Sequence, residues 1–197
     1  MPKLQHAPLI SLCPTQLTVG FLEVDAKKKK LQALSPKDQA DFLAAHPMPV
    51  VLGPGQRMYI TDHHHLARAA YDLKISQACF EVEGDLSTLS QDIFWIHMDK
   101  ESWVHPLDQH GVRHRYESIP RTLDKLVDDV YRSVAGFVRD AGGYDKTHTA
   151  FAEYIWADFF RRNIAVEDVL ENFAGAVKQG QLLARSPIAK RIPGFKE

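Results

Sequence analysis

The stretch Tyr59-Ile60-Thr61-Asp62-His63-His64-His65-Leu66-Ala67-Arg68-Ala69-Ala70 passes from a strand-like pattern into a helix-like one. Asp62 suits the N-cap of that helix, because its carboxylate can accept hydrogen bonds from first-turn amides. The three histidines are therefore expected at a helix N-terminus, where unpaired N–H groups and the helix dipole favour phosphate or carboxylate. The stretch predicts a strand-to-helix joint that binds an anion.

Helical spacing gives the histidines different surroundings. His63 shares a face with Leu66 and Ala70, so a partly buried, hydrogen-bonded histidine is the plainer interpretation, and a ligand contact is the alternative. His64 lies on the side of Arg68, four residues on, and these two with the first-turn amides could contact one phosphate. We therefore expect His63, His64 and Arg68 to bind the ligand.

Three consecutive histidines invite a zinc interpretation, but neighbours on a helix diverge by about 100° and cannot all face one ion. No second pair of histidines or cysteines stands at ligand spacing, so no metal ligands are assigned. A catalytic divalent ion such as magnesium or manganese, shared by the joint and a distant carboxylate, stays open. The candidate catalytic residues are His64, His65 and Asp62, with His65 as acid or base and Asp62 as helix cap or metal holder. A capped helix with surface histidines is the non-catalytic alternative.

The composition is ordinary for a globular chain. Of 197 residues, 45% are hydrophobic, and the formal net charge of −1 argues against a strong non-specific hold on nucleic acid. Cys13 and Cys79 match neither a metal pair nor a disulfide framework, so we expect reduced thiols. Neither a signal peptide nor an apolar run of about 20 residues is present, and the expected location is the cytoplasm, without a membrane partner.

Most expected strands precede most expected helices, which favours an α+β fold. Strands are expected over residues 17–24, 49–52, 57–60 and 78–83. Helices are expected over residues 36–45, 62–73, 89–98, 121–140, 148–162 and 166–183, with a long loop over 106–120. The run Lys27–Lys30 is either a solvated helix start or a patch that contacts phosphates.

A second polar group follows Pro120. Its members are Asp128, Asp129, Arg132, Arg139, Lys146, Glu153, Asp158, Arg161 and Arg162. Several stand four residues apart, so surface ion pairs explain many of them. The functional alternative is that Arg132, Lys146 or Glu153 folds over the histidine joint and completes a ligand site.

The residues Asp62–Ala69 resemble the Asp-x-His-His signature of the ParB-like nuclease group in the ParB/sulfiredoxin-like superfamily. Further matching stretches are Pro14–Gln16, Gly20–Val24, Phe94-Trp95, Asp128–Ser133 and Phe151–Arg161. The resemblance implies an α+β domain with a mixed sheet over residues 1–118 and a helical C-terminal portion over residues 119–197. In the wider superfamily the corresponding joint binds nucleotide phosphates: ATP in sulfiredoxins and CTP in partition proteins.

This chain departs from both of those patterns. The joint holds no cysteine, which disfavours sulfinic-acid reductase chemistry, and it lacks the paired arginines of the partition-protein box. Neither residues 121–140 nor 148–183 show a clear helix-turn-helix pattern. The sequence therefore predicts recognition of a nucleotide or nucleic acid at the joint, with phosphoester cleavage as the leading hypothesis. A non-catalytic nucleotide-binding or switching module and a plain interaction protein are the rivals, and the oligomeric state is not predicted.

Overall fold

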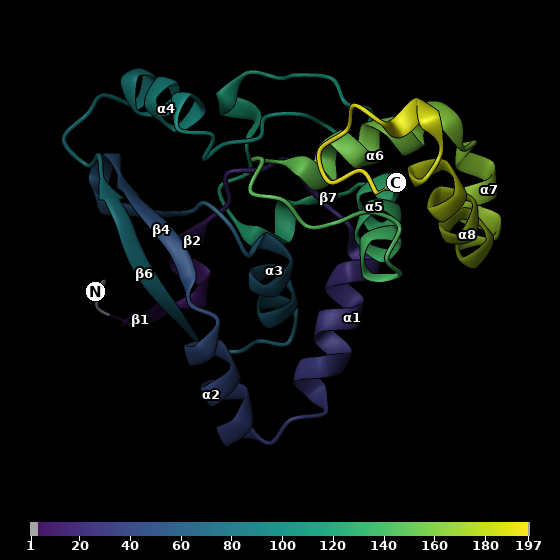
Figure 1. Cartoon of the computed structure of the whole chain (residues 1–197). Coiled ribbons are helices and arrows are strands. Elements are labelled where there is room, and N and C mark those ends of the chain that lie inside the picture. Colours follow the sequence, from purple (N-terminus) through teal and green to yellow (C-terminus); the bar gives the residue numbers. More distant parts are fainter. Residues whose placement is uncertain (1–3, 197) are drawn as a thin grey trace.

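A five-stranded mixed sheet forms the centre of the first half of the chain (Figure 1). The computed structural model describes residues 4–196. The strand order is β1-β6-β4-β5-β2, with β1–β6 and β4–β5 antiparallel and β4–β6 and β2–β5 parallel. The bounds are β1 (Gln5–Pro8), β2 (Leu12–Cys13), β4 (Met48–Gly53), β5 (Arg57–Ile60) and β6 (Gln77–Asp85). A separate parallel pair, β3 (Thr18–Val19) and β7 (Val127–Asp128), joins the early chain to the segment before the later helices.

Both faces of the sheet are covered. Successive residues of a strand point to opposite faces, and Val50 packs with the residues of α1 and α3, whereas Val51 packs with those of α4. The helices of this half are α1 (Phe21–Gln32), α2 (Pro36–Ala45), α3 (His64–Asp72) and α4 (Gln91–Lys100). We call the sheet with these four helices the sheet lobe.

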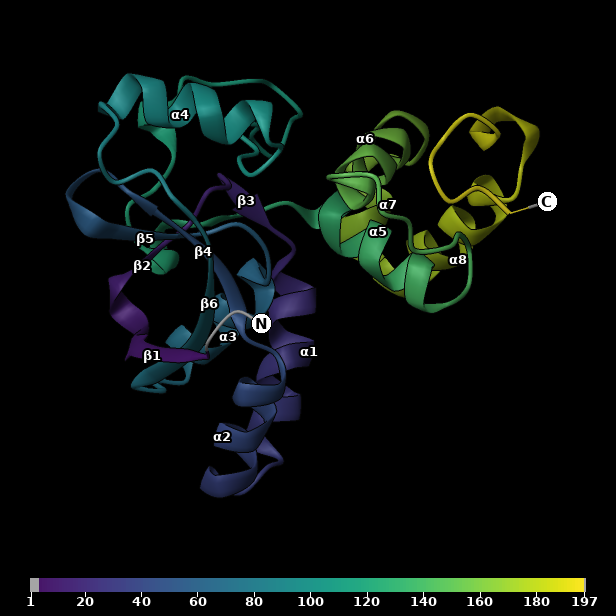
Figure 2. The same ribbon diagram turned by 60° about the vertical axis from the view of Figure 1, so that its left-hand side comes forward.

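The later helices form a cluster of their own, which we call the helical lobe; Figure 2 shows it beside the sheet lobe, with α1 at the junction. The helices are α5 (Val130–Asp140), α6 (Ala152–Asn163), α7 (Val166–Glu171) and α8 (Phe173–Ala184). Trp156 and Phe160 of α6 are fully buried against Val134 and Val138 of α5. Within residues 4–196, no helix is long and apolar enough to span a membrane.

The expected α+β class is confirmed, and several elements stand where the sequence placed them. Ser35 caps α2 by accepting a hydrogen bond from the Asp38 amide, and β4 and β5 form the expected hairpin. Short 3₁₀ helices occur at Leu9–Ser11, Pro54–Gln56, Tyr116–Ser118, Leu123–Lys125 and Pro187–Ala189. A domain boundary between residues 118 and 119 stays a prediction, and Leu123 and Leu126 pack in the core of the sheet lobe.

The expected strand over residues 17–24 is wrong. It ends at Val19, and α1 begins at Phe21, so Glu23 and the lysine run belong to one helix. Gly20 stands at this change of direction, and it lets Ser133 approach closely, because a side chain there would come within 2.5 Å of Ser133 Oγ. The Asp128 carboxylate and the Ser133 hydroxyl then accept hydrogen bonds from the first amides of α1. These partners lie more than 100 residues away, so local pattern could not reveal them.

Two expected helices are also shorter than predicted. The apolar spacing that suggested a helix from residue 121 belongs to a 3₁₀ turn and β7, and α5 begins only after Asp129, whose carboxylate accepts from the amides of Tyr131 and Arg132. The helix expected over 166–183 is divided at Asn172, which caps α8 by accepting from the Gly175 amide. In both cases a capping side chain sets the boundary.

Candidate functional site

A cavity of about 610 Å³ opens between the sheet lobe and the helical lobe. Its wall includes residues 61–66, one face of α1, Arg132 and Arg139 of α5, and most of residues 146–154. Its volume lies within the range of roughly 300–1,000 Å³ that is usual for small-molecule sites. The cavity contains the histidine joint, so the joint is part of a concave site between the lobes.

The start of α3 differs by one residue from the sequence expectation. The helix begins at His64, and the N-cap residue is His63, which has a left-handed backbone with φ 63°. Asp62 accepts a hydrogen bond from the His63 amide at 2.6 Å, and no side chain caps the first turn of the helix. Asp62 is therefore not the N-cap. The first-turn amides keep their capacity to bind an anion in the cavity.

The surroundings of His64 do not suit the acid–base role that the sequence suggested. Its Nε2 accepts a hydrogen bond from the Thr15 amide at 3.1 Å, and the side chain is almost completely buried. Burial lowers the pKa of His64 to about 3, so the ring is neutral near neutral pH. It borders the cavity but links α3 to the segment after β2. The structure thus gives His64 a structural role in place of an acid–base one.

The structure does not bring Arg68 to the cavity. Its guanidinium pairs with Asp72 at 2.9 Å, and its Nη1 donates to the carbonyl oxygens of Leu123 and Leu126 at 3.1 Å. The expected pairing of Arg68 with His64 around one phosphate is therefore wrong. His64 and Arg68 do stand four residues apart on one helix. However, His64 turns toward Thr15, and Arg68 turns toward the segment before β7. Arg68 therefore stabilises the contact between that segment and α3.

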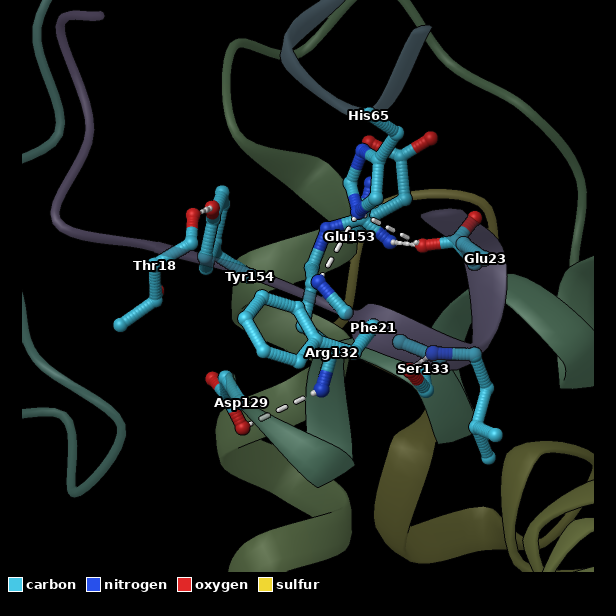
Figure 3. Close-up of polar contacts among 12 residues, drawn as sticks. Thr18, Phe21, Glu23, His65, Asp129, Arg132, Ser133, Glu153 and Tyr154 are labelled. Carbon is cyan, nitrogen blue, oxygen red and sulfur yellow. Dashed lines mark hydrogen bonds and ion pairs between the residues drawn. The ribbon is translucent and has the colours of Figure 1, made fainter. Parts of the chain in front are cut away.

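His65 lies in a polar cluster made by three helices (Figure 3). Its Nε2 accepts from the Gly20 amide at 3.0 Å and lies 3.1 Å from Glu23 Oε2. Arg132 donates from Nη1 to the same Glu23 oxygen at 2.7 Å. We call Glu23, His65 and Arg132 the buried charge cluster. It joins α1, α3 and α5 at the wall of the cavity.

Electrostatics fix the charges of this cluster. Burial raises the pKa of Glu23, but His65, which is protonated at the low pH where Glu23 titrates, and Arg132 outweigh burial and hold that pKa at about 2, so Glu23 is a carboxylate near neutral pH. Burial lowers the pKa of His65 below its usual value, and Glu23 opposes that effect only in part. Burial also lowers the pKa of the Arg132 guanidinium, but Glu23 raises it above the ordinary value. The ligand-free cluster therefore combines one carboxylate, one guanidinium and a neutral histidine.

Arg132 retains unused hydrogen-bonding capacity. Its residue is 7% exposed, and its Nε finds no partner within residues 4–196. The guanidinium lies 5.4 Å from the ring centroid of Tyr154, which limits how it can turn. A buried, charged donor without an acceptor is costly unless a ligand completes it.

Further basic side chains surround the cavity. Lys27 and Lys30 of α1 line one side, and Lys146 lines another. Lys30 lies 4.4 Å from the ring centroid of Phe42, whereas no ion pair within the described part of the chain involves Lys27 or Lys146. Arg139 pairs with Glu153. The cavity thus offers several cations to an anionic ligand.

The structure brings together residues that the sequence left in separate groups. His63, His65, Arg132, Lys146 and Glu153 all border this one cavity. Whether they bind a ligand stays a prediction. In the described residues, no group of three or more His, Cys, Asp and Glu side chains is arranged to hold a metal ion, and a divalent ion shared with the ligand stays a prediction.

Sequence reasoning missed Glu23 as a site residue and left Lys27 and Lys30 undecided. The error arose with the expected strand over 17–24, which placed Glu23 in a sheet. One signal was available: Glu23, Lys27 and Lys30 are spaced i, i+4, i+7, which places them on one face of a helix.

The fold is a mixed α+β fold with a cavity between its lobes, and comparison with known proteins gives its family. Residues 5–162 match the family described as "Putative ParB-like nuclease", and the chain belongs to that family. The protein is also similar to the crystal structure of protein Atu1540 from Agrobacterium tumefaciens. The two share 37% identity and a TM-score of 0.94, over 100% of this chain and 97% of that one. A search of curated proteins gives no match. The family resemblance drawn from the joint is thereby confirmed.

Proposed function

We propose that the cavity between the lobes binds a phosphate-bearing ligand, a nucleotide or nucleic acid, and cleaves a phosphoester. The observation that carries this proposal is that Arg132, a buried cation with an unpartnered Nε, borders the cavity that also contains the uncapped start of α3. Both features favour a bound anion. The name of the family supports phosphoester cleavage as the reaction class.

The surrounding side chains suit a ligand with more than one charged group. Arg132 and the amides of α3 would hold one phosphate, and Lys27 and Lys30, one helical turn apart, would hold a neighbouring one. His65 is the candidate acid or base, because His64 is committed to Thr15. Cys13 and Cys79 are free thiols, as expected for a reducing compartment such as the cytoplasm.

One observation favours a second candidate, a non-catalytic nucleotide-binding or switching module. Trp103 and Phe151 border the same cavity as the basic groups, and aromatic rings can stack on a nucleobase. Such a module would need the phosphate contacts but no acid or base. Binding without cleavage would distinguish it.

Isothermal titration calorimetry tests the binding step. The full chain is titrated with ATP, CTP and GTP, each with and without magnesium or manganese. We expect a saturable heat for at least one nucleotide and weaker binding as salt rises, because phosphate contacts are screened. No heat with any of these ligands would refute the nucleotide proposal.

A matched pair of lysine variants tests whether the ligand binds in the cavity. Lys27 and Lys29 are both exposed lysines of α1, but only Lys27 borders the cavity. Lys27→Ala should therefore weaken binding by about two- to tenfold, whereas Lys29→Ala, with the same loss of charge, should leave it unchanged. Equal effects of both variants would indicate a general electrostatic effect and no localised site.

Cleavage is tested by incubating the protein with single- and double-stranded DNA and RNA, with and without each metal. Activity of the protein should fall by about 100-fold or more in His65→Ala. The control is His110→Ala, which changes an exposed histidine of the 106–120 loop outside the cavity. Activity that survives in His65→Ala would place the chemistry elsewhere or in a contaminant.

A further inference from the structure

The Nε2 atom of His65 faces two groups with opposite requirements. The Gly20 amide, 3.0 Å away, is a hydrogen-bond donor, and the Glu23 carboxylate oxygen, 3.1 Å away, is an acceptor. One ring nitrogen cannot accept from the first and donate to the second at the same time. The protonation state of His65 therefore decides which contact holds.

Both contacts have consequences for the other ring nitrogen. When Nε2 accepts from Gly20, the neutral ring carries its hydrogen on Nδ1. When the ring gains a proton at Nε2, that N–H can donate to Glu23, and Nδ1 keeps its hydrogen. In either state Nδ1–H is a donor, and His65 borders the cavity.

Glu23 is built into the fold as a fixed carboxylate. Its side chain is 11% exposed, Arg132 holds it from α5, and Gly136 leaves the space for it, because a side chain there would collide with both carboxylate oxygens. Thus Glu23 has little freedom to follow a ligand, and its acceptor oxygen stays beside Nε2. This arrangement resembles the way a carboxylate orients a histidine in hydrolytic sites.

We propose that Glu23 is the positioning residue for His65, and that binding of an anion in the cavity is linked to uptake of one proton by His65. This inference rests on the proposed anion site. Solvent supplies the proton to Nε2, the bond from the Gly20 amide is replaced by one from Nε2–H to Glu23, and Nδ1–H donates to the anion. Glu23 lets His65 become a cation beside Arg132, and the anion compensates the added charge.

Other charged groups act on the ring. Glu23 and Lys27 face it from α1, Arg132 faces it from α5, and Asp62, two residues before α3, borders the same cavity. Asp128, which caps α1, also interacts with it. Lys27 and Arg132 oppose a positive ring, so the Glu23 carboxylate is the group whose removal should matter most.

The first experiment follows His65 by ¹⁵N NMR of the full chain, with its signals assigned through a His65→Gln variant. In ligand-free protein the neutral ring should carry its hydrogen on Nδ1. Glu23→Gln should move the titration of His65 to lower pH, because the imidazolium loses its carboxylate partner. Asp25→Asn is the matched control: it removes one negative charge from the exposed side of the same helix and should leave the titration unchanged.

The second experiment measures binding of sulfate, a dianion that does not itself titrate in this range, between pH 5.5 and 8. Affinity of the wild-type protein should rise as pH falls, by up to about tenfold per pH unit for one linked proton. Glu23→Gln should flatten that dependence, whereas Asp25→Asn should keep it. His65 should be an imidazolium in the sulfate-saturated wild type.

The two experiments separate this inference from the proposed function. A neutral ring with its hydrogen on Nε2, or the same His65 titration in wild type and Glu23→Gln, would overturn the role of Glu23 without any ligand. Sulfate binding with an unprotonated His65 would overturn the proton linkage. If neither sulfate nor any nucleotide binds, the anion site itself is refuted, while the ligand-free titration still decides the role of Glu23.

Should Glu23→Gln fail to fold, Glu23→Asp, which retracts the carboxylate by one methylene, should give a smaller shift in the same direction.

Discussion

The hydroxyl of Tyr154 lies 2.6 Å from the carbonyl oxygen of Thr18 and donates its hydrogen across the junction of the two lobes (Figure 3). Tyr154 belongs to α6 and Thr18 to β3, 136 residues earlier. Burial raises the pKa of Tyr154, so the phenol stays protonated and remains a donor. This contact fixes the helical wall of the cavity against the sheet lobe.

Tyr154→Phe should lower the free energy of unfolding by about 1 kcal/mol, because a buried carbonyl loses its donor while the ring packing is kept. It should also weaken ligand binding, since the hydroxyl contact fixes the helical wall of the cavity against the sheet lobe. Urea unfolding and calorimetry measure the two effects. Tyr144→Phe removes a bond within the helical lobe, to the Ala135 carbonyl, and should affect stability alone. Equal effects of the two variants on binding would contradict this view of the junction.

Arg68→Gln separates the structural role of Arg68 from the phosphate contact that sequence spacing suggested. The variant removes charged hydrogen bonds to carbonyl oxygens that have no other charged donor in the described structure, so we expect a loss of about 1.5–3 kcal/mol in the free energy of unfolding. Nucleotide affinity should stay unchanged under conditions where the variant is folded. A large loss of affinity in folded Arg68→Gln would restore Arg68 to the ligand site.

The difference between the Arg68 expectation and the structure shows what local pattern can reveal. Local sequence signals found the helix at residues 64–72, the capped helix α2 and the β4–β5 hairpin, because each depends on residues close in sequence. It could not find the start of α1, which depends on Asp128 and Ser133, or the buried charge cluster, which depends on α5.

The sequence predicted a site at the histidine joint, and the joint does border the cavity, but the contacts of its side chains were not predictable. Helical spacing groups side chains on one helix, but the partner of each one is chosen by tertiary packing. For His64 that partner is Thr15, and for His65 it is Gly20 with Glu23. Knowing the periodicity of α3 therefore gave the position of the histidines and not their chemistry.

Buried His64 should make stability depend on pH. Its ordinary pKa is 6.5 and burial lowers it to about 3 in the folded protein, so the unfolded chain binds this proton more readily. The stabilising contribution is complete above pH 6.5 and is lost as pH falls toward 3, at up to about 1.4 kcal/mol per pH unit. His65 and His105 act in the same direction.

His64→Gln tests the contribution of His64 to this pH dependence. The side-chain oxygen of the introduced glutamine can still accept from the backbone amide of Thr15, but the glutamine side chain does not titrate. The variant should be less stable than wild type at pH 7, and the difference should shrink as the pH is lowered to 5 and then 4. Urea unfolding at each pH provides the free energies. If the difference in the free energy of unfolding stays constant with pH, protonation of His64 does not destabilise the folded protein.

Gly136 and Glu23 form the last testable pair. Gly136→Ala places a side chain against the Glu23 carboxylate and should displace it from Arg132. Ala is otherwise favoured over Gly inside a helix by about 1 kcal/mol. We therefore expect Gly136→Ala to destabilise the wild-type protein, yet to stabilise the Glu23→Ala background, in which the collision is absent. The double-mutant cycle should give a coupling free energy of about 1–3 kcal/mol between the two positions. Additive effects would show that the carboxylate can move aside freely, and would then also remove the rigidity on which its positioning of His65 depends.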